Sequence, residues 1–286
     1  FAISAIYILF CCAGLLFLRH YFNAEEDIKI YDSTTYWIYT LDSRRMMADS
    51  IPRYLLFFRD VAANEYTYLL TFPLSPALSL FGESFTGYCQ SIFLVYYLPA
   101  SLFLSILSIR LAHKVQKRAP GLPAFLTSFS LCALCPVFLW PLFLGYTDVG
   151  GVLLIAVIAN YSLDWDGLSF SLRRNIILAG LSVLLLLSRR WYAFYIVGFY
   201  FSLGLASFIQ LLAQRTFTGR RLGLVALNLA VIAAVSALAI LVLNPRIFTA
   251  FLGTNYAEAY SAFKMTGSWT FTWYYMQHIG LAFFIA

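Results

Sequence analysis

The sequence predicts an all-α, polytopic bundle of transmembrane helices. Of its 286 residues, 62% are hydrophobic and only 11% are charged, whereas soluble domains carry about 25% charged residues. The mean hydropathy is +0.79, and several apolar runs reach the roughly 20 residues that a helix needs to cross a bilayer. The long runs lack the alternating pattern of transmembrane barrel strands, so helices are the expected spanning elements.

The length of each apolar run places the spans. We expect a single transmembrane module over residues 1–286, and we interpret it as a fragment truncated at both ends, because no Met opens it and its last residues lie inside an apolar run. The expected spans lie near residues 1–22, 88–110, 122–143, 147–162, 176–188, 191–212, 222–243 and 271–286. The fourth and fifth are short for a bilayer, which is expected if they tilt or line a polar cavity.

Clusters of basic residues in the short loops predict the orientation. The clusters are Arg110, Lys114, Lys117 and Arg118; Arg173 and Arg174; and Arg215, Arg220 and Arg221. All three fall on one side of the bundle, which the positive-inside rule makes cytoplasmic. The outer loop 23–87, the turn at Asp148, the Arg189–Arg190 corner and residues 244–270 are therefore expected on the extracytoplasmic side.

The first outer loop is predicted to lie along the membrane. In SIPRYLLFFRDVAANEY, apolar residues such as Leu55 and Phe58 recur at helical spacing, with Arg53 and Asp60 on the opposite face. Such a helix can lie in the membrane interface with its apolar side down. The following YLLTFPLSPALSLFGES contains two prolines and predicts a short helix or re-entrant piece before the second span.

Two acidic residues stand close to the ends of apolar spans. Asp32 follows the first span in IKIYDSTTYW, and Asp148 lies in a tight turn between two spans. A charge this close to hydrocarbon is costly and usually serves a site, a partner or a transport pathway. Each aspartate could instead cap the N-terminus of a helix, which for Asp148 would begin at Val149. Both interpretations stay open at this point.

Basic residues on the same side suggest an anion site. Arg189 and Arg190 stand at the outer face, against the charge rule, and Trp191 follows them. They could anchor the chain in the interface, or they could bind phosphate, which suits paired guanidinium groups. Arg246 and Lys264, in an aromatic-rich outer segment, could contribute to the same site.

Several of these features together resemble one enzyme family. They are the acid after the first span, the amphipathic loop helices, the Pro-Leu-x-Pro stretch at residues 73–76 and the acid in the third-to-fourth turn. This combination is similar to the polyprenyl-phosphate-dependent GT-C glycosyltransferases, which include protein mannosyltransferases and aminoarabinose transferases. The stretch YDSTTYW resembles their acidic motif, with a single acid where many members have two. The resemblance covers the seven-span core, nearly the whole chain.

The resemblance implies transfer of a sugar, with inversion, from a polyprenyl-phosphate donor to an acceptor hydroxyl. Asp32 would take the proton of the hydroxyl, and Asp148 would assist or share a divalent cation, Mg²⁺ or Mn²⁺, with it. The cations that would hold the lipid phosphate are Arg189, Arg190, Arg246 and Lys264. The acceptor would be a lipid, a glycan or a protein. The enzyme would be a multi-pass protein of a bacterial plasma (inner) membrane, with its site facing the periplasm, surrounded by membrane lipids and without a nucleic-acid partner.

Two other classes of function stay open. A transporter or flippase of a lipid-linked or anionic substrate could also use a membrane-embedded acid and an arginine pair, but it would be expected to show inverted repeats or paired broken helices. A non-catalytic scaffold would not need acids at both tight outer positions. The sequence contains neither a Walker loop nor a G-x-G-x-x-G motif, which argues against a nucleotide-driven engine within this chain.

Overall fold

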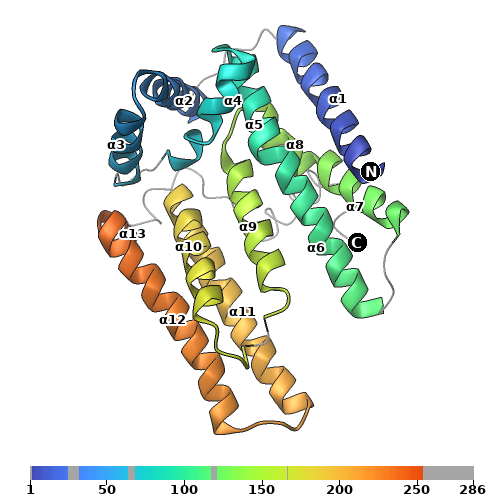
Figure 1. Cartoon of the computed structure of the whole chain (residues 1–286), viewed down its shortest axis with the longest axis vertical. Coiled ribbons are helices and arrows are strands. Elements are labelled where there is room, and N and C mark those ends of the chain that lie inside the picture. The colour runs from blue at the N-terminus through green and yellow to red at the C-terminus, as the bar shows by residue number, and fades with distance from the viewer. Residues whose placement is uncertain (1, 25–31, 64–67, 117–120, 166, 254–286) are drawn as a thin grey trace, which may run out of the picture.

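The computed structural model describes residues 2–24, 32–63, 68–116, 121–165 and 167–253 (Figure 1). Nearly all of these residues are helical, and no strand occurs among them. The predicted all-α class is therefore confirmed. In chain order the elements are α1 (Ala2–Ala24), α2 (Asp32–Asp49), α3 (Ile51–Ala62), the single 3₁₀ turn η1 (Leu69–Thr71), α4 (Leu74–Phe81), α5 (Phe85–Ile92), the π-helical segment η2 (Phe93–Tyr97), α6 (Leu98–Gln116), α7 (Leu122–Leu134), α8 (Pro136–Phe143), α9 (Asp148–Ser162), α10 (Leu172–Ser188), α11 (Tyr192–Ala213), α12 (Gly219–Leu243) and α13 (Arg246–Gly253).

Four of the described helices are long and apolar enough to cross a membrane, which supports a membrane-spanning protein. They are Ile3–Ala24, Phe85–Val115, Tyr192–Ala213 and Gly219–Leu243. A fifth span results if α7 and α8, bent by 47° relative to each other, cross together. The predicted spans at 147–162 and 176–188 are the helices α9 and α10, of 15 and 17 residues. The predicted span 271–286 lies outside the described residues, so the seven-span core stays a prediction.

Helix α9 occupies the centre of the bundle. It packs against α6 on one side and α10 on the other, and α11 and α12 form a long hairpin beside α10 (Figure 1). The N-terminus of α9 and the C-terminus of α10 lie at the same end, together with the start of α2. The described basic residues of the predicted clusters belong to the last turns of α6, the first turns of α10 and α12, and the α11–α12 connection, which lie at the opposite end (Figure 1). Asp32, Asp148 and Arg189 therefore lie at the end opposite to the basic clusters, as predicted.

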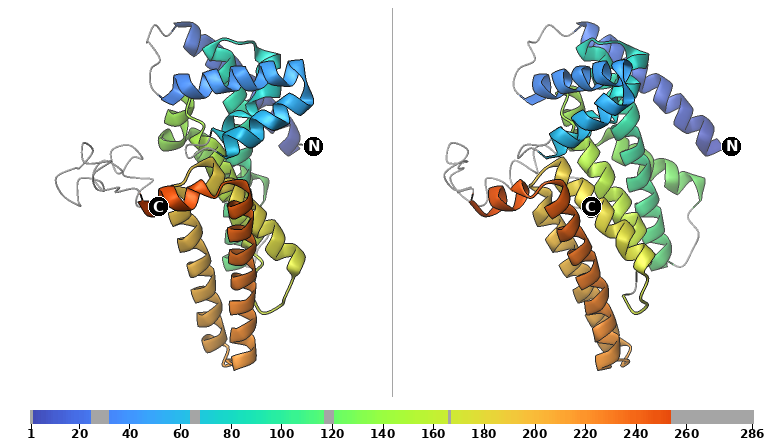
Figure 2. Two further views of the ribbon diagram at one scale, coloured as in Figure 1. Left: turned by 90° about the vertical axis from the view of Figure 1, so that its left-hand side faces the viewer. Right: turned by 60° about the vertical axis from the view of Figure 1, so that its left-hand side comes forward.

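Helices α2 and α3 lie across the end of the bundle that carries Asp32 and Asp148 (Figure 2). The predicted helix in this loop is α3, and Ser50 caps it by accepting a hydrogen bond from the amide of Arg53. Its apolar face is only partly covered: Ala62 is buried, whereas Leu55 is 58% exposed. An exposed apolar stripe on a helix across the bundle end fits the predicted position in the membrane interface.

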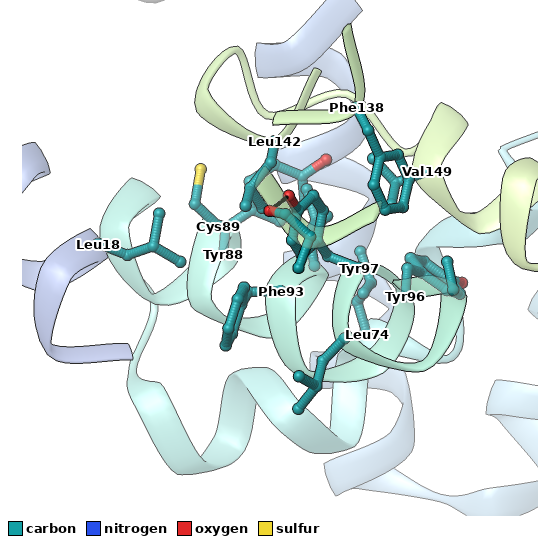
Figure 3. Packing of buried hydrophobic residues seen from close by; sticks show 14 of the residues in the cluster. Leu18, Leu74, Tyr88, Cys89, Phe93, Tyr96, Tyr97, Phe138, Leu142 and Val149 are labelled. Carbon is teal, nitrogen blue, oxygen red and sulfur yellow. Dashed lines mark hydrogen bonds between the residues drawn. The ribbon is translucent and has the colours of Figure 1, made fainter. Parts of the chain in front are cut away.

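We call α2, α3 and the η1–α4 segment, which lie over this end of the bundle, the roof (Figure 2). Two buried tyrosines beneath it, in α5 and η2, fix neighbouring turns of the chain (Figure 3). Tyr88 donates a hydrogen bond to the carbonyl of Gly145 over 2.9 Å, and Tyr96 donates to the carbonyl of Leu70. Gly145 has a φ of +73°, and a Cβ there would lie 2.7 Å from the ring of Phe85. Only glycine meets both demands at low cost. The tyrosines thereby fix the turn before α9 and the η1 turn above it.

Candidate active site: a carboxylate–arginine centre

Three charged side chains from three distant segments meet at the roofed end of the bundle. Arg189 directs Nε to Asp148 Oδ1 over 3.1 Å and Nη2 to Asp148 Oδ2 over 3.2 Å. The same Nη2 lies 3.9 Å from Asp32 Oδ2. The arginine side chain is only 16% exposed, whereas those of Asp148 and Asp32 are 41% and 52% exposed. We call Asp32, Asp148 and Arg189 the carboxylate–arginine centre.

Helix ends favour these charges where they stand. Asp32 and Asp148 are the first residues of α2 and α9, so each carboxylate lies at the positive end of a helix dipole. Arg189 follows the last residue of α10 in an extended conformation, with φ of −158° and ψ of 131°. Its positive charge therefore lies at the negative end of a helix. The fold brings two helix N-termini and one helix C-terminus together, and each charged side chain has the sign opposite to the partial charge of its helix end.

The capping interpretation of Asp148 is wrong in its detail. Helix α9 begins at Asp148 itself, and the residue before it is Thr147. Both carboxylate oxygens of Asp148 are engaged by Arg189, in the two-point geometry that suits a guanidinium and a carboxylate. For Asp32 the residues before the helix lie outside the described part of the chain, so the capping alternative for Asp32 stays open.

An aromatic ring supports the guanidinium. Arg189 Cζ lies 5.2 Å from the ring centre of Tyr36, which is only 2% exposed. A cation over a buried ring is favourable because the ring face carries partial negative charge. Tyr36 in turn packs edge-on against Tyr68, with 5.5 Å between ring centres. The arginine is therefore held on one face by aromatic side chains and on its edge by carboxylates.

Two glycines allow a close approach to the start of α9. Tyr192 Oη donates a hydrogen bond to the backbone carbonyl of Asp148 over 3.3 Å. A Cβ on Gly151 would lie 1.9 Å from that Oη, and one on Gly150 would lie 3.0 Å from a methyl group of Leu70. Small residues at these two positions let α11 and the roof pack against the first turn of α9. The position of Asp148 is thereby fixed from two sides.

The remaining predicted site residues take different places. Arg190 is half-buried, and the ion pairs recorded for Asp32 and Asp148 within the described part of the chain are made by Arg189. Arg246 is exposed at the start of α13 and makes no ion pair with either aspartate. Lys264 lies outside the described residues. Phosphate binding by these three residues stays a prediction.

The predicted divalent cation does not fit the centre as it is arranged. Mg²⁺ and Mn²⁺ require several oxygen ligands around one point. Here the guanidinium of Arg189 stands between the two carboxylates and takes up both oxygens of Asp148. Within the described ranges, no group of three or more His, Cys, Asp or Glu side chains could hold a metal ion.

An apolar cavity of about 380 Å³ adjoins the centre beneath the roof. We call it the roof cavity; its lining residues come from α3, the η1–α4 segment, η2, α9 and α10: Tyr54, Leu55, Phe58, Leu69, Leu70, Phe72, Pro73, Tyr96, Gly150, Leu153, Leu154, Leu184 and Ser188. Gly150 lies two residues after Asp148, and Ser188 directly precedes Arg189. Leu55 and Leu184 are 58% and 42% exposed, so the cavity reaches the outer surface of the bundle.

The sequence offered a signal for the residues that were missed. Tyr36 lies four residues after Asp32, on the same face of α2, and Tyr192 begins α11 three residues after Arg189, across a short turn. No protein-family model matches the chain, and no curated protein or solved structure is significantly similar to it. Function is therefore inferred from the centre, the cavity and the helices around them.

Proposed function

We propose that the protein is a membrane glycosyltransferase of the GT-C type, which moves a sugar from a polyprenyl-phosphate donor to an acceptor hydroxyl. The observation that carries the proposal is the guanidinium of Arg189, placed between two carboxylates, with the preceding residue Ser188 in the lining of an apolar cavity. A phosphate-binding cation, a proton-accepting acid and a space for a lipid chain are the three groups that this reaction needs.

The donor fits the order of residues along the cavity wall. The prenyl chain would occupy the roof cavity, whose lining is apolar and reaches the bundle surface at Leu55 and Leu184. The phosphate would then meet Arg189, because its neighbour Ser188 lines the cavity. An arriving phosphate carries negative charge and competes with Asp148 for the fork of the guanidinium.

The two aspartates differ in how firmly they are held. Asp148 gives both oxygens to Arg189 at 3.1 and 3.2 Å, whereas Asp32 makes one contact at 3.9 Å. The oxygens of Asp32 are therefore more available for contact with an acceptor hydroxyl. Asp148 would hold Arg189 in position, and Tyr36 beneath the guanidinium would limit its movement to the plane of the ring.

In the proposed reaction the acceptor oxygen attacks the anomeric carbon on the face opposite the phosphate. Its proton passes to Asp32, the bond between the anomeric carbon and the phosphate oxygen breaks, and the phosphate leaves with the electron pair. Arg189 stabilises the charge that the leaving phosphate gains. A single displacement inverts the anomeric centre. The positive-inside rule orients the site toward the extracytoplasmic side, which in a bacterial inner membrane is the periplasm.

One feature favours transport of a lipid-linked or anionic substrate as a second candidate. Helices α7 and α8 form a broken pair, bent by 47° at Cys135 and Pro136, and transporters build their substrate sites from broken helices. Transporters generally carry such breaks in pairs, and the described residues contain one bent pair.

The assay that tests the proposal uses the full chain in proteoliposomes, with a panel of polyprenyl-phosphate-linked sugars supplied one at a time. We expect one donor to lose its sugar and release polyprenyl phosphate, in amounts equal to the glycosylated product. A fluorescent short-chain prenyl-phosphate sugar that crosses the bilayer intact, with no phosphate released, would favour transport and contradict the transferase. Asp32→Asn provides the matched control, since it keeps the shape of the side chain and removes its ability to accept a proton.

A further inference from the structure

A second apolar cavity lies on the other side of α9. Its volume is about 450 Å³. We call it the kink cavity, because it forms where the chain bends by 47° between α7 and α8. Its lining residues come from α6, α7, α8 and α9: Leu104, Leu131, Cys132, Cys135, Val137, Phe138, Pro141, Asp148, Val149 and Val152. Asp148 is the one charged residue in this lining, so the cavity ends directly at the carboxylate–arginine centre.

Helix α9 forms the wall between the two cavities. Val149 and Val152 lie one turn apart and face the kink cavity, whereas Gly150 and Leu153 face the roof cavity. This alternation follows the helical repeat, which places positions i and i+3 on one face. In Figure 1, α9 stands between α10 on one side and α6 on the other. The two cavities therefore approach Asp148, at the first turn of α9, from opposite sides.

We propose that the acceptor is itself an amphiphile, whose apolar chain occupies the kink cavity and whose hydroxyl lies at Asp148. This inference rests on the proposed function and narrows its acceptor from lipid, glycan or protein to a molecule with an apolar tail. A water-soluble glycan or a protein segment would approach the centre from the solvent side and would leave the kink cavity without an occupant. Two apolar cavities that meet at one charged centre match a reaction between two amphiphiles.

The geometry also fits the atom balance of the reaction. The acceptor hydroxyl at the mouth of the kink cavity gives its proton to Asp32, forms a bond to the anomeric carbon, and thereby becomes the glycosylated amphiphile. The phosphate leaves from the opposite side with its electron pair and stays on the prenyl chain in the roof cavity. The wall of α9 keeps the two chains apart while their head groups meet above Asp148. Each product then leaves through its own cavity.

The test uses two photoreactive probes with the same tail and different head groups. One is hexadecanol with a diazirine in its chain, and the other is the corresponding hexadecyl phosphate. The full chain, in nanodiscs of phosphatidylcholine and phosphatidylglycerol, is irradiated with each probe, and the labelled peptides are identified by mass spectrometry. We expect the alcohol to label kink-cavity residues such as Phe138 and the phosphate to label roof-cavity residues such as Leu154.

Neighbouring residues on α9 provide matched variants. Val152→Trp fills the kink cavity and Leu153→Trp fills the roof cavity. We expect Val152→Trp to lower labelling by the alcohol about tenfold and to change labelling by the phosphate less than about twofold, with the reverse for Leu153→Trp. If either variant fails to fold, Val137→Trp and Leu184→Trp replace the pair; these side chains line the two cavities and are 38% and 42% exposed, so a larger side chain has room.

The outcomes separate this inference from the proposed function. If labelling by the alcohol is unchanged in Val152→Trp and Val137→Trp, or spreads evenly over the lipid-facing surface, the inference of an amphiphilic acceptor is wrong. If labelling by the phosphate is instead unchanged in both Leu153→Trp and Arg189→Lys, the proposed donor site is wrong, and with it the proposed function. Selective labelling of the kink cavity by the alcohol, lost in the kink-cavity variants alone, supports the inference.

Discussion

The two ends of α9 carry ion clusters with opposite ratios of acidic to basic side chains. At its N-terminus, two carboxylates share one guanidinium, that of Arg189. Beyond its C-terminus, the single carboxylate of Asp164 is shared by two cations, Arg110 and Lys114. The first cluster adjoins two apolar cavities, and the second is exposed, with Asp164 63% accessible.

The hydrogen bonds at the two ends differ as well. Arg110 and Lys114 also donate to the backbone carbonyls of Asn160 and Leu163, so they satisfy the free carbonyl groups at the end of α9. That cluster joins α6 to the end of α9, and both of its cations contact Asp164 as well as a backbone carbonyl. The carboxylate–arginine centre has two carboxylates for one guanidinium, and Asp32 lies 3.9 Å from that guanidinium, farther than Asp148. We therefore propose a catalytic role for the cluster beside the apolar cavities and an anchoring role for the exposed cluster at the other end of α9.

The largest expected effect comes from removing the proton acceptor at the first end. Asp32→Asn should lower sugar transfer about a hundredfold or more, the usual contribution of a general base, with little change in expression. The matched change at the second end, Asp164→Asn, should leave the rate within about twofold, because an exposed ion pair contributes little. Rates of polyprenyl phosphate release for both variants check this, and equal losses would remove the distinction between the two ends.

A smaller loss is expected from changing the shape of the cation while keeping its charge. Arg189→Lys loses the planar fork that contacts both oxygens of Asp148, so we expect about tenfold weaker use of the donor. Arg190→Lys should have the smaller effect, because the ion pairs recorded for the two aspartates of the centre are those of Arg189. Transfer rate against donor concentration distinguishes the two. A larger loss for Arg190→Lys would transfer the phosphate site to that residue.

Packing at the first turn of α9 gives the next effect. Gly151→Ala would place a methyl group 1.9 Å from Tyr192 Oη and displace the ring from the carbonyl of Asp148. We expect a loss of about 1–3 kcal/mol in unfolding free energy. Gly180→Ala, in α10 with no atom near its added methyl group, should instead stabilise by about 0.5–1 kcal/mol. The shift in melting temperature in one detergent checks both, and a stable Gly151→Ala protein would argue against a tight fit.

The smallest effect concerns pH at the second end. The hydrogen bond from Lys114, followed by the charges of Lys114 and Arg110, holds the pKa of Asp164 below its usual value. A lowered pKa in the folded protein means that the ion pair stabilises the fold above the unfolded pKa of about 3.9 and that this contribution is lost as the pH falls through the folded value. Because the side chain is exposed, the change should stay below about 1 kcal/mol.

The difference in melting temperature between the wild type and Asp164→Asn, followed from about pH 6 to about pH 3, isolates this contribution from the titration of other acids. We expect the wild type to be slightly more stable at the upper pH and the two proteins to converge at the lower pH. A difference that stays constant over this range would mean that the charge of Asp164 plays no part.

The sequence predicted the helices and the side of the bundle on which the charges lie, because both follow from local patterns. Apolar run length predicted α6 and α12, and helical spacing predicted α3. From the residues alone, Asp32, Asp148 and Arg189 were expected only on the same side of the membrane, and their meeting in one site was implied by the family resemblance. Their distances depend on how α2, α9 and α10 pack, which involves contacts over more than a hundred residues of chain that no local pattern encodes.

The interpretation of the site changed for the same reason. Sequence alone could not choose between Arg189 and Arg190, since adjacent residues have the same composition and hydropathy around them. The packing selects Arg189, whose guanidinium lies over the ring of Tyr36. The sharing of a divalent cation by the two aspartates, which the family resemblance implied, stays a prediction; in the structure the positive charge between them is that of arginine.

Removal of divalent cations tests the central feature of the site most directly. If Arg189 supplies the positive charge between Asp32 and Asp148, transfer by the purified wild-type protein should proceed at an unchanged rate in EDTA, and added Mn²⁺ or Mg²⁺ should not increase it. In parallel, Arg189→Lys should reduce transfer under both conditions. Loss of transfer in EDTA that Mn²⁺ restores, together with normal transfer by Arg189→Lys, would contradict the carboxylate–arginine centre and assign the charge to a metal ion.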